Sequence, residues 1–419
     1  MSCTRYIAVL ALSASTLVGA AAQAAPINEL SASASLDSSY DDNVYNSRGA
    51  DFVNRITPHL SYRLLDPRVK LEAAYDFSYW TYAFGKAENS LNHRADLNVE
   101  GHPTRRLTLQ ASDEFSRAED PGFLTQIGVV APQIGIFDNV ANALIGVNIV
   151  RRVFASLSYT NHFASFDAYT PSMMGLPPLY DGMEHDGQAF TSFSITRRDD
   201  LRFGGRAQLF TAGPQAVDST RWDIGATYSP TVGWRHQFLP ALEATADAGP
   251  AYYESLGGAA NIVDAMGNHI APASGWTWRG SAMLRYNTPS WRTSIGYVHD
   301  LLGATGAGTA LWADALYAQA GYHWLEKFDA HFGVGYFRNG AAVNQPWAYD
   351  GIIADTFVDW RVVDYFRVGA YYNLRWQEAG PGVVGVGGQF PSVTRNIVGI
   401  RLLAVLGADA KPPRREVHP

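Results

Sequence analysis

Apolar and polar residues alternate with a period of two from Leu30 almost to the C-terminus. In the run that starts at Val69, the odd positions are apolar and the even positions include Lys70, Glu72 and Asp76. Successive side chains of a strand point to opposite faces, so this pattern predicts strands with one apolar and one polar face. Similar runs, about ten residues long, recur at 93–100, 201–209, 276–286, 328–336 and 366–376. No helical period competes over comparable lengths.

Short and long connections alternate between these runs. Eight tight connections are expected at 65–68, 102–105, 150–152, 197–200, 239–241, 287–290, 325–327 and 362–364. Longer segments rich in Gly, Pro and Asn separate them, including 119–138, 167–186, 255–274 and 378–390. An antiparallel meander joins neighbouring strands in this way, with all turns at one end and all loops at the other. The sequence therefore predicts an all-β, transmembrane, up-and-down antiparallel β-barrel of about 18 strands, with 16–20 fitting the same spacing.

A soluble propeller or β-helix is the alternative fold for a strand-rich chain. A propeller would repeat about every 40 residues and a β-helix at shorter intervals, and the sequence shows neither period. Charges on the polar faces are costly in a packed core but suit a water-filled lumen. We expect the following residues to line that lumen: Lys70, Glu72, Asp76, Arg94, Asp96, Arg202, Arg206, Arg279, Arg285, Asp329, Asp355, Asp359, Arg367 and Arg375.

The first 24 residues have the pattern of a Sec signal peptide. Arg5 precedes an apolar run, and Ala22-Gln23-Ala24 fits the small-residue cleavage rule, which predicts cleavage after about Ala24. The only cysteine, Cys3, lies inside this segment, so the mature chain has no disulfide and no thiolate chemistry. We expect residues 1–24 to be the signal, 25–406 the barrel and 407–419 a polar periplasmic tail.

Charge is distributed unevenly along the chain. Lys and Arg number 32 against 39 Asp and Glu, a net charge of −7, which argues against nucleic-acid binding. The long loops are mainly acidic, with Asp186 and Asp300 assigned to them, whereas the short turns carry a basic rim: Arg105, Arg106, Arg151, Arg152, Arg197 and Arg198. This rim either concentrates anionic solutes at the periplasmic mouth or only anchors the turns at the membrane interface, and both interpretations fit.

Aromatic residues cluster toward the predicted strand ends, as interfacial girdles do. The clusters are the run 79–82 together with Trp276, Trp278, Trp324, Trp360 and Trp376. Cross-strand packing in any sheet would account for some of them.

Sequence motifs that would indicate catalysis or phosphate binding are weak. The glycine-rich stretches 303–308 and 382–388 do not stand between a strand and a helix, and no nucleophile motif singles out a serine. The acidic groups Asp41–Asp42 and Asp181, Glu184 and Asp186 could bind calcium or bridge lipopolysaccharide, but solvated loop charge is the preferred interpretation. We expect no enzyme activity, no cofactor and no metal site.

The segment 34–45 contains Tyr40-Asp41-Asp42-Asn43-Val44, which resembles the opening strand of the β-barrel porin 2 family of Gram-negative bacteria. The element 248–253 is similar to that family as well. The resemblance implies a large outer-membrane barrel and, for some members, a link to exopolysaccharide export. The polar tail departs from the usual aromatic end of such barrels.

These observations predict an outer-membrane channel for passive passage of hydrophilic solutes or polymer, with polysaccharide secretion preferred. The alternatives are a general or substrate-selective uptake porin, with 119–138 or 167–186 folded inward, and a plugged structural or adhesive barrel. Expected partners are outer-membrane lipid, lipopolysaccharide and the barrel assembly machinery, with a periplasmic polysaccharide export complex if polymer is the cargo.

Overall fold

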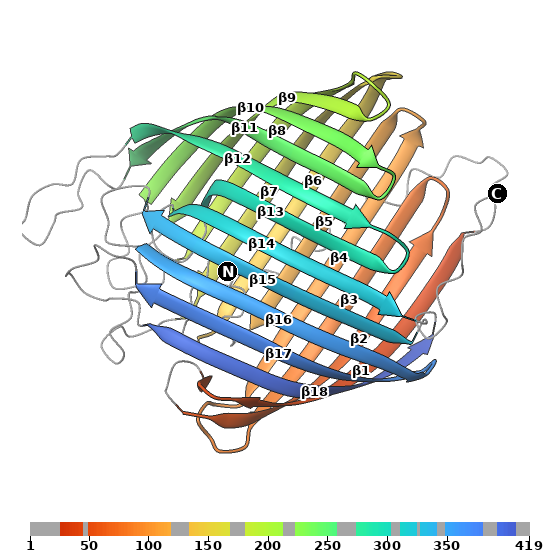
Figure 1. Ribbon diagram of the computed structural model, residues 1–419, viewed down its shortest axis with the longest axis vertical. Coiled ribbons are helices and arrows are strands. Elements are labelled where there is room, and N and C mark those ends of the chain that lie inside the picture. The colour runs from red at the N-terminus through yellow and green to blue at the C-terminus, as the bar shows by residue number, and fades with distance from the viewer. Residues whose placement is uncertain are drawn as a thin grey trace, which may run out of the picture.

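The computed structural model describes residues 26–44, 49–118, 134–167, 181–212, 223–257, 274–302, 311–324, 327–341, 348–379 and 392–407. The alternating runs form eighteen strands in one sheet (Figure 1). Their bounds are β1 Ile27–Asp41, β2 Asp51–Leu65, β3 Val69–Tyr82, β4 Ser90–Thr104, β5 Leu107–Ala118, β6 Ile136–Val150, β7 Val153–Phe166, β8 Gly182–Ser194, β9 Asp199–Ala212, β10 Asp223–Leu239, β11 Leu242–Gly257, β12 Ser274–Asn287, β13 Trp291–Leu302, β14 Leu311–Trp324, β15 Phe328–Ala341, β16 Ala348–Val363, β17 Phe366–Ala379 and β18 Val393–Gly407.

Pairing of the first strand with the last closes the sheet. β1 and β18 run antiparallel from Ser31↔Gly407 to Asp41↔Ile397, and every other strand pairs with its neighbours in the chain. The predicted all-β, up-and-down antiparallel barrel of about 18 strands is confirmed. The described residues contain no helix long and apolar enough to cross a membrane. The predicted signal, and residues 408–419 of the predicted tail, lie outside the described residues.

The eight short connections all fall at one end of the barrel, here called the turn end, and the nine longer ones at the other, the loop end. The predicted loops 119–138 and 167–186 run into the strands that follow them, and 255–274 and 378–390 begin inside β11 and β17. Asp138 belongs to β6, which begins at Ile136, and Glu184 and Asp186 belong to β8, which begins at Gly182. These strand ends were mistaken for loops because their polar side chains lie on the inner face.

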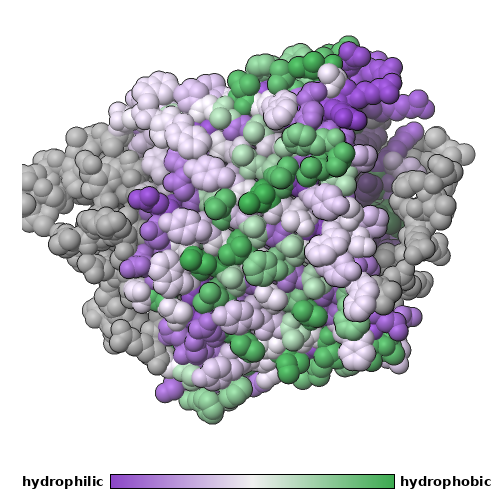
Figure 2. Space-filling view, in the orientation of Figure 1, coloured by the Kyte–Doolittle hydropathy of each residue, from purple (hydrophilic) through white to green (hydrophobic). Residues whose placement is uncertain are grey.

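The two faces of the sheet differ in polarity. One face exposes large apolar side chains on most strands, as a lipid-facing surface does. Examples are Leu36, Ile56, Leu60, Ile145, Leu157, Val232, Ile295, Leu316 and Ile400. On the face seen in Figure 2, hydrophobic side chains are spread over the outer wall between weakly polar ones.

The predicted aromatic girdle holds only in part. Trp276, Trp278, Trp324 and Trp360 are exposed on the outer face. Trp80, in contrast, lies opposite Arg55 and Ser90 on the polar inner face, and the Arg55 guanidinium lies 3.9 Å from the centre of its ring. A Trp with such a cationic partner is stabilised away from the interface, so its assignment to the girdle is wrong.

Two ion pairs join the strands that close the barrel. Arg401 Nε donates to Asp37 at 2.6 Å, and Arg395 donates to Asp41 through Nε at 2.9 Å and Nη2 at 2.6 Å. The Arg395 and Asp41 side chains are only 6% and 1% exposed, so this ion pair is almost completely buried.

Removing one member of this pair is expected to destabilise the closed barrel. Arg395→Met leaves the Asp41 carboxylate buried without its cation and should lower the free energy of unfolding by about 3–5 kcal/mol. Arg63→Met, at the exposed Arg63–Glu72 pair, is the matched control and should cost less than about 1 kcal/mol. Urea unfolding of the protein refolded into vesicles measures both. Equal effects would show that the closure does not depend on the buried pair.

Candidate functional site: the lumen of the barrel

The ladder registers place all fourteen charged residues expected in the lumen on the inner face of the sheet. Lys70 lies opposite Glu100, and Asp76 lies opposite His59 and Arg94. The same register, followed strand by strand round the barrel, reaches the residues on β9 to β17. Arg206 of β9 and Asp300 of β13, which are not neighbouring strands, meet on this face, as inward side chains of a closed sheet can.

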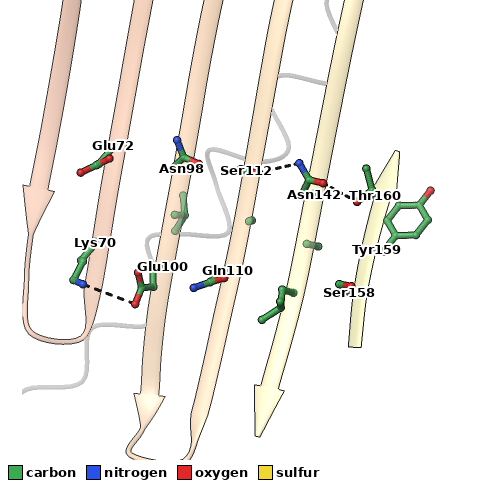
Figure 3. Close-up of a pocket in the computed structure, with 14 residues that line it drawn as sticks. Lys70, Glu72, Asn98, Glu100, Gln110, Ser112, Asn142, Ser158, Tyr159 and Thr160 are labelled. Atoms are coloured by element: carbon green, nitrogen blue, oxygen red, sulfur yellow. Dashed lines mark hydrogen bonds and ion pairs between the residues drawn. The ribbon is translucent and has the colours of Figure 1, made fainter. Parts of the chain in front are cut away.

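One wall of the turn end is lined mainly by uncharged hydrogen-bonding groups. A cavity of about 570 Å³ lies along β3 to β7, with Lys70, Glu72 and Glu100 at its β3–β4 side (Figure 3). Across β5 to β7 the Thr160 hydroxyl donates to Asn142 at 2.7 Å, and Asn142 donates to Ser112 at 3.2 Å. The row offers amide and hydroxyl groups in both donor and acceptor roles.

The opposite wall of the turn end is basic. Since the sheet closes on eighteen strands, β12 to β15 lie across the lumen from β3 to β7. Their cavity of about 670 Å³ is lined by Arg285, Arg292, His323 and His331, with Asp329 as the carboxylate among them. His323 Nδ1 lies 2.5 Å from Asp329 Oδ1, and His331 Nε2 lies 3.1 Å from Asp355 Oδ2.

Aromatic rings lie along the inner wall over glycines of neighbouring strands. Tyr317 covers Gly296 and Tyr371 covers Gly399, so that a Cβ at either glycine would collide with the ring. Tyr317 and Tyr371 are half-buried in these positions, whereas Phe210 is fully buried. The inner-face rings that cover glycines are Phe154, Phe210, Tyr317, Phe357 and Tyr371.

A cluster of four charged residues narrows the lumen toward the loop end. Arg206 of β9 contacts Asp186 of β8 at 2.5 Å and Asp300 of β13 at 3.0 Å, and Arg279 of β12 contacts Asp300 at 2.6 Å. Their side chains are less than one-fifth exposed. Three strands separate β9 from β13 in the sheet, so the cluster spans a chord of the barrel rather than following its wall.

The loop end of β13 itself leans into the lumen. Gln208 of β9 donates to the backbone carbonyl of Leu301 at 3.3 Å, and Leu301 packs with Phe210 and Tyr253 in a buried cluster. A side chain of β9 therefore reaches the backbone of β13. This contact places the loop end of β13 inside the part of the lumen that β8 to β12 enclose.

Sequence reasoning identified Arg206 and Arg279 but missed their partners. Asp186 and Asp300 were assigned to acidic loops, and the structure places both in strands on the inner face. The outward positions beside Asp186 are His185 and Gly187, which are not apolar, so the alternation that would have marked β8 is weak there. The polar even positions 184, 186 and 188 were the remaining signal.

The candidate divalent-cation residues are occupied by other contacts. Asp41 binds Arg395, Asp42 accepts the backbone and side-chain amides of Asn396 at 2.6 Å, and Asp186 binds Arg206. Asp181 accepts the backbone N–H of Phe166 at 2.9 Å. Within the described ranges, no three or more His, Cys, Asp or Glu side chains are grouped to hold a metal ion.

No family model and no curated protein sequence matches this chain. Solved structures with a similar fold include OccK5 (OpdH) of Pseudomonas aeruginosa, 9% identical over 91% of this chain and 98% of that chain, with a TM-score of 0.43. OccAB4 of Acinetobacter baumannii is 9% identical over 92% and 99%, with a TM-score of 0.43. The loop L8 deletion mutant of OmpT, an outer membrane protein of Vibrio cholerae, is 10% identical over 91% and 100%, with a TM-score of 0.40. At this level of similarity these structures carry no argument about function.

The six arginines of the basic rim all lie at the turn end and are exposed. They stand at the connections β4–β5, β6–β7 and β8–β9, and none forms an ion pair with another residue of the described chain. Their charge is therefore free to act on solutes or on lipid headgroups.

Reversing part of this rim distinguishes the two roles. If the rim concentrates anions, changing Arg151, Arg152, Arg197 and Arg198 to Glu should shift the reversal potential in a salt gradient toward cation selectivity. The shift should shrink at high ionic strength because screening is stronger. An unchanged reversal potential together with weaker membrane insertion would assign these arginines to interface anchoring.

Proposed function

We propose that this chain is an outer-membrane channel through which hydrophilic solutes pass passively. The observation that carries the proposal is a closed barrel whose outer face is apolar and whose inner face is charged and open to water at the turn end. Lipid surrounds such a sheet and water fills it. The fourteen inner-face residues then line the path, and the turn end faces the periplasm with the basic rim.

Selection by size and charge would occur at the Arg206–Asp186–Asp300–Arg279 cluster. Solutes entering from the wide turn end meet this partly buried group before they reach the loop end. A narrow polar passage that is preceded by a wide vestibule is suited to a substrate-selective porin.

The inner surface favours polyhydroxylated cargo. Amide and hydroxyl side chains on β5 to β7 match sugar hydroxyls, and the flat rings of Tyr317 and Tyr371 match the C–H faces of sugar rings. Together with the resemblance of residues 40–44 to the β-barrel porin 2 family, these features support export of a polysaccharide as the finer proposal. Its partners would be lipopolysaccharide, the assembly machinery and a periplasmic export complex.

Planar-bilayer recording of the refolded protein tests the channel. A large, steady conductance that neutral oligosaccharides block from one side supports passage of polysaccharide. Steady conductance without block supports a general porin. A folded barrel without conductance would contradict both and leave the structural or adhesive alternative.

The cross-lumen cluster makes a specific prediction about conductance. Arg206→Gln removes the cation that ties β13 to β8 and should widen the passage, raising single-channel conductance at least about twofold. Arg94→Gln removes an equal charge from β4, which contributes no residue to this cluster, and should change conductance little. Heat-modifiable mobility on gels confirms that both variants fold. Equal conductance in the two variants would mean that the cluster does not limit flow.

The inner rings make a prediction about sugar binding. Tyr371→Leu should shorten the blocking time of oligosaccharides by about 2–10-fold, the loss expected for one aromatic contact. Tyr372→Leu, next to it on β17, is the matched control, because Tyr372 points outward and donates to Asn396 at 2.8 Å. Noise analysis of blocked currents measures the times. Equal shortening in both would rule out a lumen-specific role for the ring.

A further inference from the structure

The wall of the barrel is incomplete between β12 and β13. Their ladder runs only from Gly280↔His299 to Asn287↔Arg292 and is the shortest in the barrel. Residues 274–279 of β12 pair with β11 on one side, but no described residue pairs with them on the other. At about 3.3 Å per residue, this unpaired edge is roughly 20 Å long. Figure 1 shows the two strands together at their turn ends and apart toward their loop ends.

The contacts that pull β13 inward account for the seam. Asp300 is held by Arg206 and Arg279, and Leu301 is 2% exposed within its cluster with Phe210 and Tyr253. If the β12–β13 ladder continued in the same register, Leu301 would lie opposite Trp278 on the outer face. From there Leu301 could not contact Phe210 and Tyr253. The inward contacts therefore replace the missing part of the ladder.

Aromatic side chains flank the seam on the outer face. Trp276 is 72% exposed, the most exposed large apolar side chain of the described barrel. Trp278 stacks on His299 with ring centres 4.4 Å apart, and His299 stacks on Trp312 of β14 at 5.3 Å. Rings of this kind occupy the boundary between lipid chains and polar headgroups.

A small charged cavity lies directly behind the seam. It has a volume of about 210 Å³ and is lined by Arg279 and Gly280 of β12 and by Val298, His299 and Asp300 of β13. Its farther wall contributes Arg202, Arg206 and Asp247. The lining holds three arginines and two aspartates, and Asp186, just outside it, binds Arg206 at 2.5 Å. The volume suits a headgroup rather than a whole drug-sized ligand.

We propose that this seam is a lateral binding site for a single-chain anionic amphiphile. The tail stays in the outer leaflet between Trp276 and Trp278, and the anionic head enters the cavity and binds Arg279 and Arg206 beside Asp300. An open backbone edge is costly in hydrocarbon, and an occupant that fills the seam lowers this cost. The site depends on the proposed membrane location but not on solute passage through the lumen.

Photolabelling of the full barrel in phosphatidylcholine vesicles tests the site. The probe is a C12 fatty acid with a diazirine in its tail, and adducts are mapped by peptide mass spectrometry. Labelling should concentrate on residues 274–280 of β12 and 298–301 of β13. The methyl ester of the same probe, which lacks the charge, should label these peptides at least about tenfold less.

Two variants separate a specific site from general contact with lipid. Arg279→Gln should reduce labelling of the seam peptides at least about tenfold, the loss expected for a charge-assisted hydrogen bond. Arg285→Gln is the control, because it lies on the inner face of the same strand but outside this cavity. Labelling spread evenly over the outer wall, or unaffected by Arg279→Gln, would overturn the proposal. Conductance recorded on the same variants reports separately on the channel.

Discussion

Backbone hydrogen bonding in a medium without water is the constraint on which the rest of this structure depends. Every strand inside a bilayer must give its N–H and C=O groups to a neighbour, and only a sheet that closes on itself leaves no edge. Pairing of β1 with β18 meets this requirement, and the buried Arg395–Asp41 pair fixes it at the loop end. Once the sheet is closed, successive side chains of each strand point alternately toward the lipid and toward the lumen.

The lumen acquires its character from that assignment. Residues that would be costly in a packed core become the lining of a water-filled space, with uncharged polar groups along β5 to β7 and basic groups along β12 to β15. At the loop end of β13, backbone pairing with β12 stops, and side-chain contacts across the lumen replace it. Arg206, Arg279 and Asp300 hold it inside the barrel, which both narrows the lumen and leaves an edge of β12 open. Positions that depart from regular strand pairing tend to be functional. The unpaired end of β13 is such a position, and it connects the narrow passage with the seam.

The sequence predicted most of the architecture because the relevant signals are local. A period of two and the alternation of short and long connections are sufficient for strand number, topology and inner-face charges such as Lys70 and Arg206. The sequence did not predict a residue's contacts where its partner is distant in the chain. Asp186 and Asp300 look like loop acids until β8, β9, β12 and β13 are brought together, and Trp80 looks like a girdle residue until Arg55 is placed against it. The β12–β13 seam has no sequence signal, since it results from competition between ladder pairing and contacts made across the lumen.

The most direct test is a cysteine scan of β3, because residues 26–407 of the barrel contain no cysteine. Single cysteines at positions 70 to 77 are exposed in vesicles to a charged thiol reagent and, separately, to a lipid-soluble one. The account predicts a strict period of two, with positions 70, 72, 74 and 76 labelled from water and positions 71, 73, 75 and 77 labelled from lipid. Uniform labelling by the charged reagent, or labelling with the opposite phase, would contradict an apolar outer wall around a water-filled lumen.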